Sequence, residues 1–198
     1  MSSMIGSTSW VVPGTYAENA RALEGIVDIV ELLVYTWDVP TRSLLDSECD
    51  DLLRRSLQYS VHLPTDTIEH CVQAVRYFED RRFPVLNYVL HPLDGWREYQ
   101  WNERVAVENL MDKLDPYDRM VFDIGHHLLG QPFPEQLEHT IVEIHAMGVV
   151  DGIDHSPLDE ATLDLLTPYI GPDVPVVFEV FELDGLKHSL DVWKSAVH

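Results

Sequence analysis

The sequence predicts a compact α/β fold, a (β/α)8 TIM barrel with shortened helices. Short apolar runs alternate with amphipathic segments along the 198 residues, and this alternation is typical of parallel strands joined by helices. Eight of the runs have the length of a strand, which is the number that closes such a barrel. Because barrels of this kind typically have about 250 residues, we expect some of the helices to be cut short.

The beginning of the chain predicts two strands and two helices. The apolar run at residues 5–12 (IGSTSWVV) predicts the first strand. Residues 15–23 predict a helix, because their first threonine and the glutamate three residues later have the spacing of a capping box. Residues 28–35 (DIVELLVY) form an almost continuous apolar run, as expected of a strand covered on both faces. The leucine-spaced polar segment 42–55 predicts the second helix.

The remaining six strands follow at intervals that leave little room for helices. The shortest unit lies between Pro92 and Arg104, where the residues suffice for barely two turns of helix. The six apolar runs that predict these strands are residues 59–62, 85–91, 105–108, 120–123, 141–145 and 175–179.

The composition indicates a globular protein, which we expect to fold as a single domain over residues 1–198. Hydrophobic residues make up 45% of the chain and charged residues 24%, and no apolar run is long enough to span a bilayer. Because no basic and apolar leader opens the sequence, we expect a cytoplasmic protein. Cys49 and Cys71 stand apart without C-x-x-C spacing, so we expect free thiols.

The charge of the chain bears on its partners. The formal net charge is -21, from 34 acidic side chains against 13 Lys and Arg. Nucleic acid is held by clustered cations, and here only Arg54 with Arg55 and Arg81 with Arg82 are adjacent. The charge therefore argues against nucleic acid as a partner, and we expect a small-molecule substrate. Several of the carboxylates would be neutralised locally if they bind metal.

The ends of the predicted strands share one chemical property. From the third run onward, each run ends in an imidazole or a carboxylate, and parallel barrels carry their chemistry at this end of the strands. Taken singly, each residue reads as a helix cap or as a hydrogen-bonded structural group. Taken together they predict a divalent metal site, because six unpaired polar groups at one barrel mouth are costly unless a cation satisfies them. The six residues are His62, His91, Glu108, Asp123, His145 and Glu179.

Three further residues extend this set. His126 follows Asp123 with the spacing D-x-x-H, at the strand end and in the loop after it. Asp154 and His155 lie in the loop expected after the seventh strand. Mixed histidine and carboxylate ligands suit Zn, Mn or Fe about equally, so the predicted cofactor is a divalent metal of this group.

In their order and spacing these residues resemble the xylose isomerase-like barrels, a superfamily that includes endonuclease IV and the sugar-phosphate isomerases and epimerases. The similarity runs over nearly the whole chain. Its motifs are VHLP at 61–64, VLHP at 89–92, VEN at 107–109, FDIGHH at 122–127, EIHAMG at 143–148, DH at 154–155 and VFEVF at 177–181. Within the superfamily the chain is most similar to the cobamide-remodelling phosphodiesterases, through residues 9–38, SVHLPTD at 60–66 and IDHSPL at 153–158.

The resemblance implies a division of the candidate ligands among metals. In the superfamily a central divalent metal is held by residues that match Glu108, Asp123, His145 and Glu179. The endonuclease-like branch adds a second metal on matches of His62, His91 and the shared Glu108, and a third on matches of His126, Asp154 and His155. At the third site the endonuclease has D-x-H, whereas Asp154 and His155 are adjacent here.

The expected function is a metal-dependent phosphodiester hydrolase that acts on a small or corrinoid, cobamide-like phosphodiester. In a site of two or three metals, one ion lowers the pKa of a bound water while the others polarise the phosphoryl oxygens. Aromatic side chains on predicted loops could line the mouth for a flat corrin ring, or could instead cover the helices. These aromatic residues are Trp37, Trp96, Tyr99 and Trp101.

Two alternatives stay open. In a sugar isomerase or epimerase with one metal, Glu108 and Glu179 would face each other across the substrate, as a catalytic acid and base pair at carbon. His62 and His91 would then orient hydroxyl groups. The second alternative is a barrel that binds a metabolite without turnover. About one ion per chain would support the isomerase, and two or three the hydrolase; the sequence does not indicate the substrate, the metal or the oligomeric state.

Overall fold

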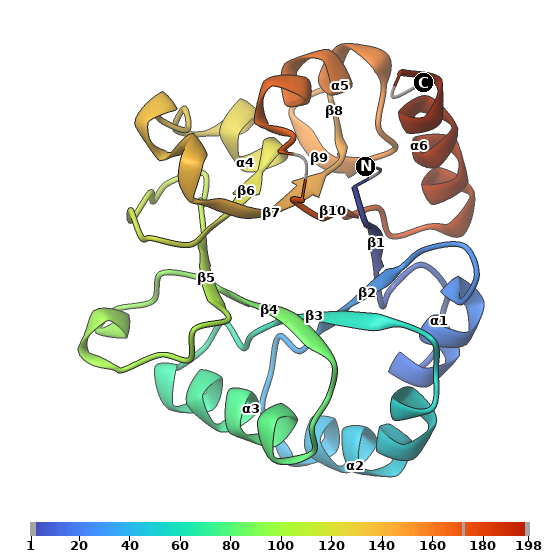
Figure 1. Cartoon of the computed structure of the whole chain (residues 1–198), viewed down its shortest axis with the longest axis vertical. Coiled ribbons are helices and arrows are strands. Elements are labelled where there is room, and N and C mark those ends of the chain that lie inside the picture. Colours follow the sequence, from blue (N-terminus) through green and yellow to red (C-terminus); the bar gives the residue numbers. More distant parts are fainter. Residues whose placement is uncertain (1–2, 172, 197–198) are drawn as a thin grey trace.

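Eight parallel strands close into a barrel, as the alternation of apolar runs predicts (Figure 1). The computed structural model describes residues 3–171 and 173–196. The strands follow one another around the barrel in the order β1-β10-β7-β6-β5-β4-β3-β2. They are β1 (Ile5–Thr8), β2 (Ile29–Leu33), β3 (Gln58–His62), β4 (Val85–Leu90), β5 (Val105–Glu108), β6 (Met120–Asp123), β7 (Ile141–Ala146) and β10 (Val176–Phe178).

Six α-helices lie outside the barrel, among the described residues. The expected capping box at the first of them is confirmed, because the Thr15 side chain accepts from the N–H of Glu18 and the Glu18 side chain accepts from the N–H of Thr15. The α-helices are α1 (Tyr16–Leu23), α2 (Val39–Leu53), α3 (Ile68–Asp80), α4 (Ile124–Leu129), α5 (Glu160–Leu166) and α6 (Leu183–Ala196). Three 3-10 helices complete the set: η1 (Trp96–Glu98), η2 (Glu135–Thr140) and η3 (Thr167–Tyr169).

The helical layer is thin beside β5. In the connection from β4 to β5 the only helical element is the three-residue η1, and the connection from β5 to β6 contains no helix. Figure 1 shows loops on this side of the barrel, whereas α1, α2 and α3 cover the barrel elsewhere with longer helices. The expected shortening of helices is therefore confirmed, and it is concentrated in these two connections.

A small hairpin follows β7, where we expected only a loop. Its strands are β8 (Gly148–Val150) and β9 (Ile153–Ser156), which pair antiparallel. Asp151 and Gly152 form the turn with φ of 54° and 78°, and an Asp-Gly pair with positive φ at both residues is a favoured two-residue hairpin turn. The hairpin carries Asp154 and His155.

The interior of the barrel is unusually polar for this fold, in which branched apolar side chains usually fill the inside. Glu31, Ser60 and Asn87 are aligned in register on β2, β3 and β4, and all three are buried. A small apolar cluster of Val89 and Ala106 with one more valine occupies the same interior. The larger apolar core lies between the strands and the helices.

Two other expectations concern the whole chain. Cys49 and Cys71 are free, and the Cys71 thiol donates to the carbonyl oxygen of Pro64 over 2.9 Å. Among the residues that the structure describes, no helix is both long and apolar enough to cross a bilayer. The cellular compartment stays a prediction.

Candidate metal centre at the barrel rim

The strand ends bring the six predicted residues to one rim of the barrel. His62, Glu108 and Asp123 are the last residues of β3, β5 and β6. His145 is the penultimate residue of β7, while His91 and Glu179 directly follow β4 and β10. All of them are buried except His91, whose side chain is 22% exposed.

The central group surrounds one nitrogen of His145. The Nδ1 atom lies 3.0 Å from Glu108 Oε1, 3.6 Å from Glu179 Oε1 and 3.9 Å from Asp123 Oδ2. One ligand atom from each of these four residues can be chosen such that all lie within 4.8 Å of one another. This spacing allows the four residues to hold one cation.

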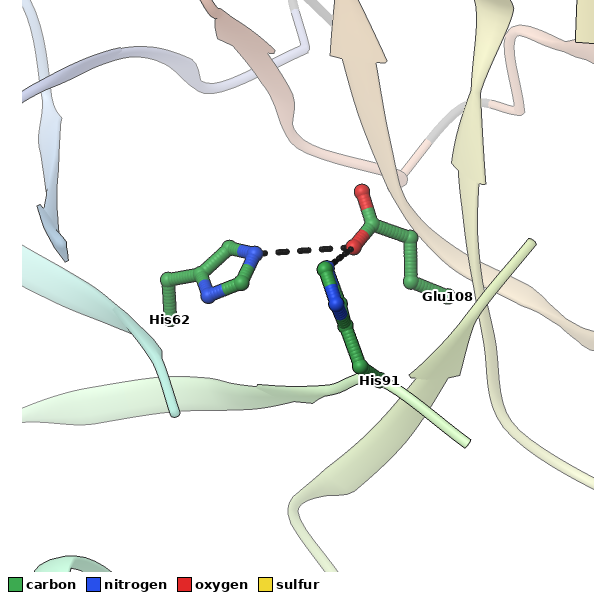
Figure 2. A group of neighbouring side chains, drawn as sticks. All are labelled: His62, His91 and Glu108. Carbon is green, nitrogen blue, oxygen red and sulfur yellow. Dashed lines mark ion pairs between the residues drawn. The ribbon is translucent and has the colours of Figure 1, made fainter. Parts of the chain in front are cut away.

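A second group shares Glu108 with the first (Figure 2). Glu108 Oε2 lies 2.8 Å from His91 Nε2 and 3.5 Å from His62 Nε2. The His62 and His91 rings meet edge to face, with their centroids 4.8 Å apart. Figure 2 shows both imidazoles turned toward the same carboxylate. These groups could hold a second cation, or could hydrogen-bond to a bound molecule.

Asp123 caps a helix through one carboxylate oxygen and leaves the other without a partner. Its Oδ1 atom accepts the backbone N–H of His126 over 2.6 Å and so caps α4. Its Oδ2 atom is buried, has no hydrogen-bond partner and faces the central group. Because a buried carboxylate oxygen without a partner is costly, the free oxygen fits a cation in this position.

The charges of the central group fit a cation as well. Burial raises the pKa of Glu179 well above its ordinary value, because His145 offsets the lost hydration only in part and Glu31 adds repulsion. Burial also raises the pKa of Asp123. Burial acts in the same direction on Glu108, but hydrogen bonds from His145 and two further imidazoles outweigh it and hold the pKa well below its ordinary value. Additional positive charge beside the three carboxylates would favour their ionised forms.

The residues expected to bind a third metal are less well assembled. His126 Nδ1 lies 2.8 Å from the carbonyl oxygen of Asn109. His155 Nε2 lies 3.7 Å from Asp154 Oδ1, and its Nδ1 lies 3.2 Å from the carbonyl oxygen of Glu179. None of the candidate metal groups found among the described residues contains His126, Asp154 or His155. Metal binding by these three residues stays a prediction.

Sequence reasoning missed two acidic residues inside the barrel. Glu31 on β2 and Glu143 on β7 are fully buried, and each has an oxygen within 3.5 Å of His145 Nε2. Both lie in the middle of apolar runs, DIVELLVY and IVEIHA. An ionisable residue at the centre of a strand that is covered on both faces is the signal that could have revealed them.

The four aromatic residues that could line the mouth or cover the helices are not among the residues that line the cavity over the rim groups. Trp37 is buried against Tyr77, and Trp96 is buried with its Nε1 donating to Asp115. Trp37 and Trp96 thus fit the covering role, one of the two roles that the sequence left open. Tyr99 and Trp101 pack against each other in the β4 to β5 connection, and Trp101 Nε1 donates to the carbonyl oxygen of Trp96.

A cavity of about 340 Å³ opens over the rim groups. Ligand pockets typically span about 300–1,000 Å³, so this cavity suits a small ligand. It is lined by Tyr35, His62, Thr65, His91, Glu108, His126, His155 and Glu179. A larger cavity of about 690 Å³ lies elsewhere, beside Asp28 and Arg55. Arg55 already forms ion pairs with Glu24 and Asp51 there, so its charge is less available to a ligand in the larger cavity.

Comparisons with known proteins bear on the fold. No family model matches the chain, and no curated protein matches it. A solved structure of a D-tagatose 3-epimerase-like protein matches with 16% identity and a TM-score of 0.67, over 98% of this chain and 97% of that chain. A D-psicose 3-epimerase solved with D-fructose matches at 10% identity and a TM-score of 0.49, over 96% and 90% of the two chains. D-psicose 3-epimerase of Clostridium cellulolyticum H10, solved with D-tagatose, matches with 14% identity and a TM-score of 0.42, over 96% of this chain and 90% of that chain.

The chain shares its fold with the D-tagatose 3-epimerase-like protein. The expected phosphodiester hydrolase is wrong, because the solved structure that shares this fold is a D-tagatose 3-epimerase-like protein, which agrees with the isomerase alternative. The comparisons do not support the likeness to cobamide-remodelling enzymes. The residues expected at a third metal site are also absent from the candidate metal groups among the described residues.

Proposed function

We propose that the protein is a metal-dependent isomerase or epimerase of a small sugar. The observation that carries this proposal is the central group at the rim, in which Glu108, Asp123, His145 and Glu179 offer ligand atoms within 4.8 Å of one another. The shared fold of a D-tagatose 3-epimerase-like protein, aligned over 98% of the chain, supports it. The name of that protein refers to D-tagatose, a ketohexose, so we propose ketohexoses as the class of substrate.

The four residues of the central group would hold one divalent cation, of Zn, Mn or Fe type. When bound, the cation supplies Lewis acidity, which polarises the substrate carbonyl and makes the proton on the neighbouring carbon easier to remove. The unpartnered Oδ2 of Asp123 and the repulsion among the buried carboxylates are the features of this chain that fit a cation.

In this proposal Glu108 and Glu179 remove and return the proton at the substrate carbon. They stand on β5 and after β10, and both place a carboxylate oxygen within 3.6 Å of His145 Nδ1. Epimerisation needs one group that removes the proton from one face and another that returns it to the opposite face. Two carboxylates from different strands can meet this requirement across a substrate that lies between them.

Hydroxyl groups of the sugar would be oriented by the second rim group. His62 Nε2 and His91 Nε2 both approach Glu108 Oε2 at the wall of the 340 Å³ cavity. Neutral imidazoles donate through one nitrogen and accept through the other, which suits hydroxyl groups. Burial lowers the pKa of His62, and this favours its neutral form.

The proposal is tested by proton exchange at carbon. Protein loaded with Mn²⁺ is incubated with D-tagatose and a panel of ketohexoses in D₂O, and products are followed by NMR and chromatography. We expect an epimer or an isomer that carries deuterium at the carbon where the proton was removed. Metal-loaded protein that binds a ketose but exchanges no carbon-bound proton would contradict the proposal.

The roles of the two glutamates are tested by isosteric variants. Glu108→Gln and Glu179→Gln should each lower kcat by about 10²–10⁴-fold, the usual contribution of a general acid or base. Glu103→Gln is the matched control, because Glu103 is exposed in the turn just before β5. Metal content is measured for each variant. A Glu179→Gln variant that holds metal and retains full turnover would show that Glu179 transfers no proton.

A further inference from the structure

Beneath the rim, the second nitrogen of His145 faces two more carboxylates. His145 Nε2 lies 3.4 Å from Glu143 Oε1 and 3.5 Å from Glu31 Oε1. All three side chains have no exposed surface. The imidazole therefore lies between the rim group above and a separate acidic pair below, inside the barrel.

Glu143 is held firmly from its other side. Its Oε1 accepts from the Ser60 hydroxyl and its Oε2 accepts from Asn87 Nδ2, both over 2.7 Å. Asn87 Oδ1 in turn accepts from the Arg119 guanidinium over 2.6 Å. These hydrogen bonds form a chain from Arg119, at the start of β6, through the barrel interior to the underside of His145. A carboxylate with both oxygens anchored has little freedom to turn away.

Glu31 has no such anchor. Neither of its oxygens has a hydrogen-bond partner, and His145 Nε2 has none either. A buried N–H without an acceptor costs about 1–3 kcal/mol. Within 4 Å of this nitrogen, the acceptors that form ion-pair contacts among the described residues are Glu31 and Glu143. Their distances of 3.4 and 3.5 Å are only slightly longer than the range of about 2.7–3.2 Å that is usual for such a hydrogen bond.

We propose that Glu143, together with Glu31, positions His145 by accepting a hydrogen bond from its Nε2–H. The Nδ1 lone pair is then directed at the rim group. This inference rests on the proposed metal-dependent function, because Nδ1 is the nitrogen that would bind the cation. A histidine that binds metal through one nitrogen commonly donates its other N–H to a carboxylate, which fixes the tautomer and makes the ligand more basic. Glu31 and Glu143 are thus positioning residues that do not contact the substrate.

A second cation among the same three side chains is the competing explanation. It would need His145 Nε2 as a ligand while Nδ1 binds the rim cation, and hence an imidazole stripped of both ring protons. A proton on Nε2 satisfies the nitrogen without that cost. Metal counts separate the two explanations, because positioning adds no ion and a second site adds one.

The test measures Zn²⁺ binding and the His145 tautomer. Zn²⁺ affinity is determined by competition with a chelator for wild type, Glu143→Gln, Glu31→Gln and the exposed control Glu138→Gln. Carboxylate partners of metal-binding histidines typically contribute 10–100-fold to affinity. We expect Glu143→Gln to weaken Zn²⁺ binding by about that factor, Glu31→Gln to weaken it less, and the control to match wild type.

The tautomer gives a readout that a merely structural role would not move. In ¹⁵N-histidine NMR of the Zn²⁺-loaded wild type, His145 should carry its proton on Nε2, with slow solvent exchange. Glu143→Gln should speed that exchange. If Glu143→Gln does not fold, Glu31→Gln decides by the same two measurements, because it loses no hydrogen bond. Unchanged affinity and exchange in the folded variants would overturn the inference, and so would a second Zn²⁺ that Glu143→Gln releases.

Failure here differs from failure of the proposed function. A wild type with the Nε2 tautomer and weakened Zn²⁺ binding in Glu143→Gln, but without proton exchange on any ketose, would remove the epimerase and keep the positioning role. An active epimerase whose Zn²⁺ affinity is unchanged by both substitutions would keep the proposed function and remove the positioning role.

Discussion

At the scale of single residues, one side chain can stabilise the fold and also face the rim group. Asp123 ends β6, caps α4 through Oδ1 and turns Oδ2 toward the rim group. Glu108 is shared in the same way, because one oxygen faces His145 and the other faces His62 and His91. A cap and a ligand therefore need not be competing explanations of one residue.

The two roles of Asp123 can be separated by substitution. Asp123→Asn keeps an oxygen that can cap α4 but loses the charge, so the metal-free variant should be at least as stable as wild type while its metal affinity falls strongly. Asp123→Ala also loses the cap, which should cost about 0.5–2 kcal/mol of stability. Urea unfolding and chelator competition measure the two effects. Loss of metal affinity in Asp123→Ala but not in Asp123→Asn would show that the charge is not needed.

Strand-end residues were predicted from the sequence as one group, whereas the position of the two glutamates below them was not. His62, Glu108 and Asp123 close apolar runs, and parallel strands bring such ends to one rim. Glu31 and Glu143 interrupt apolar runs, and a single polar residue within a run does not show which side of the strand it occupies. Which carboxylates share an imidazole depends on the stagger of the strands around the barrel, which the sequence alone does not specify.

At the scale of elements, strands were easier to predict than the segments between them. The predicted bounds of β5 and β6 agree with the structure, because their short apolar runs are flanked by charged residues. The hairpin of β8 and β9 was missed, since its strands are short and Gly148 is their only fully buried residue. The two connections next to β5, which contain no α-helix, are stabilised by side-chain contacts in place of helical packing. Trp96 Nε1 and Arg97 both donate to Asp115, which ties one connection to the other.

This tie predicts a pH-dependent stability. Burial opposes the charge of Asp115, but hydrogen bonds from Arg97 and Trp96 outweigh it and hold the pKa below its ordinary value. A lowered pKa stabilises the fold above the ordinary aspartate pKa of about 3.9, and the contribution is lost as the pH falls through the folded-state pKa. Asp115→Asn should therefore cost about 1–3 kcal/mol at pH 7.

Urea unfolding at a series of pH values measures that difference. The gap in stability between wild type and Asp115→Asn should narrow as the pH falls below about 4. Asp118→Asn, a substitution at a neighbouring exposed aspartate of the same connection, serves as the control and should leave stability nearly unchanged. A gap that stays constant down to the lowest folded pH would show that the charge of Asp115 contributes nothing.

At the scale of the whole molecule, a net charge of -21 surrounds a barrel that also buries acidic residues. Glu31, Glu108, Asp123, Glu143 and Glu179 all lie within 4 Å of the His145 ring nitrogens. So much buried acid is destabilising without compensation. Protons can compensate in part, since burial raises the pKa of Glu31 to about 8. A divalent cation at the rim would compensate further.

Divalent metal should therefore stabilise the fold. A ligand at 100 times its Kd adds about 2.7 kcal/mol, which for a domain of this size raises Tm by about 5–10 °C. Mn²⁺ should produce this shift in wild type, EDTA should reverse it, and Asp123→Asn should not respond. NaCl at matched ionic strength controls for general screening of the surface charge. An equal response of wild type and Asp123→Asn would place the stabilising ion elsewhere.

The central claim is that one cation binds at the rim of this barrel, among four side chains from different strands. Anomalous diffraction from crystals grown with Mn²⁺ tests it most directly. We expect one strong peak within bonding distance of Glu108, Asp123, His145 and Glu179. Crystals whose anomalous map has no peak among these four residues, although the protein in solution binds Mn²⁺, would contradict the claim.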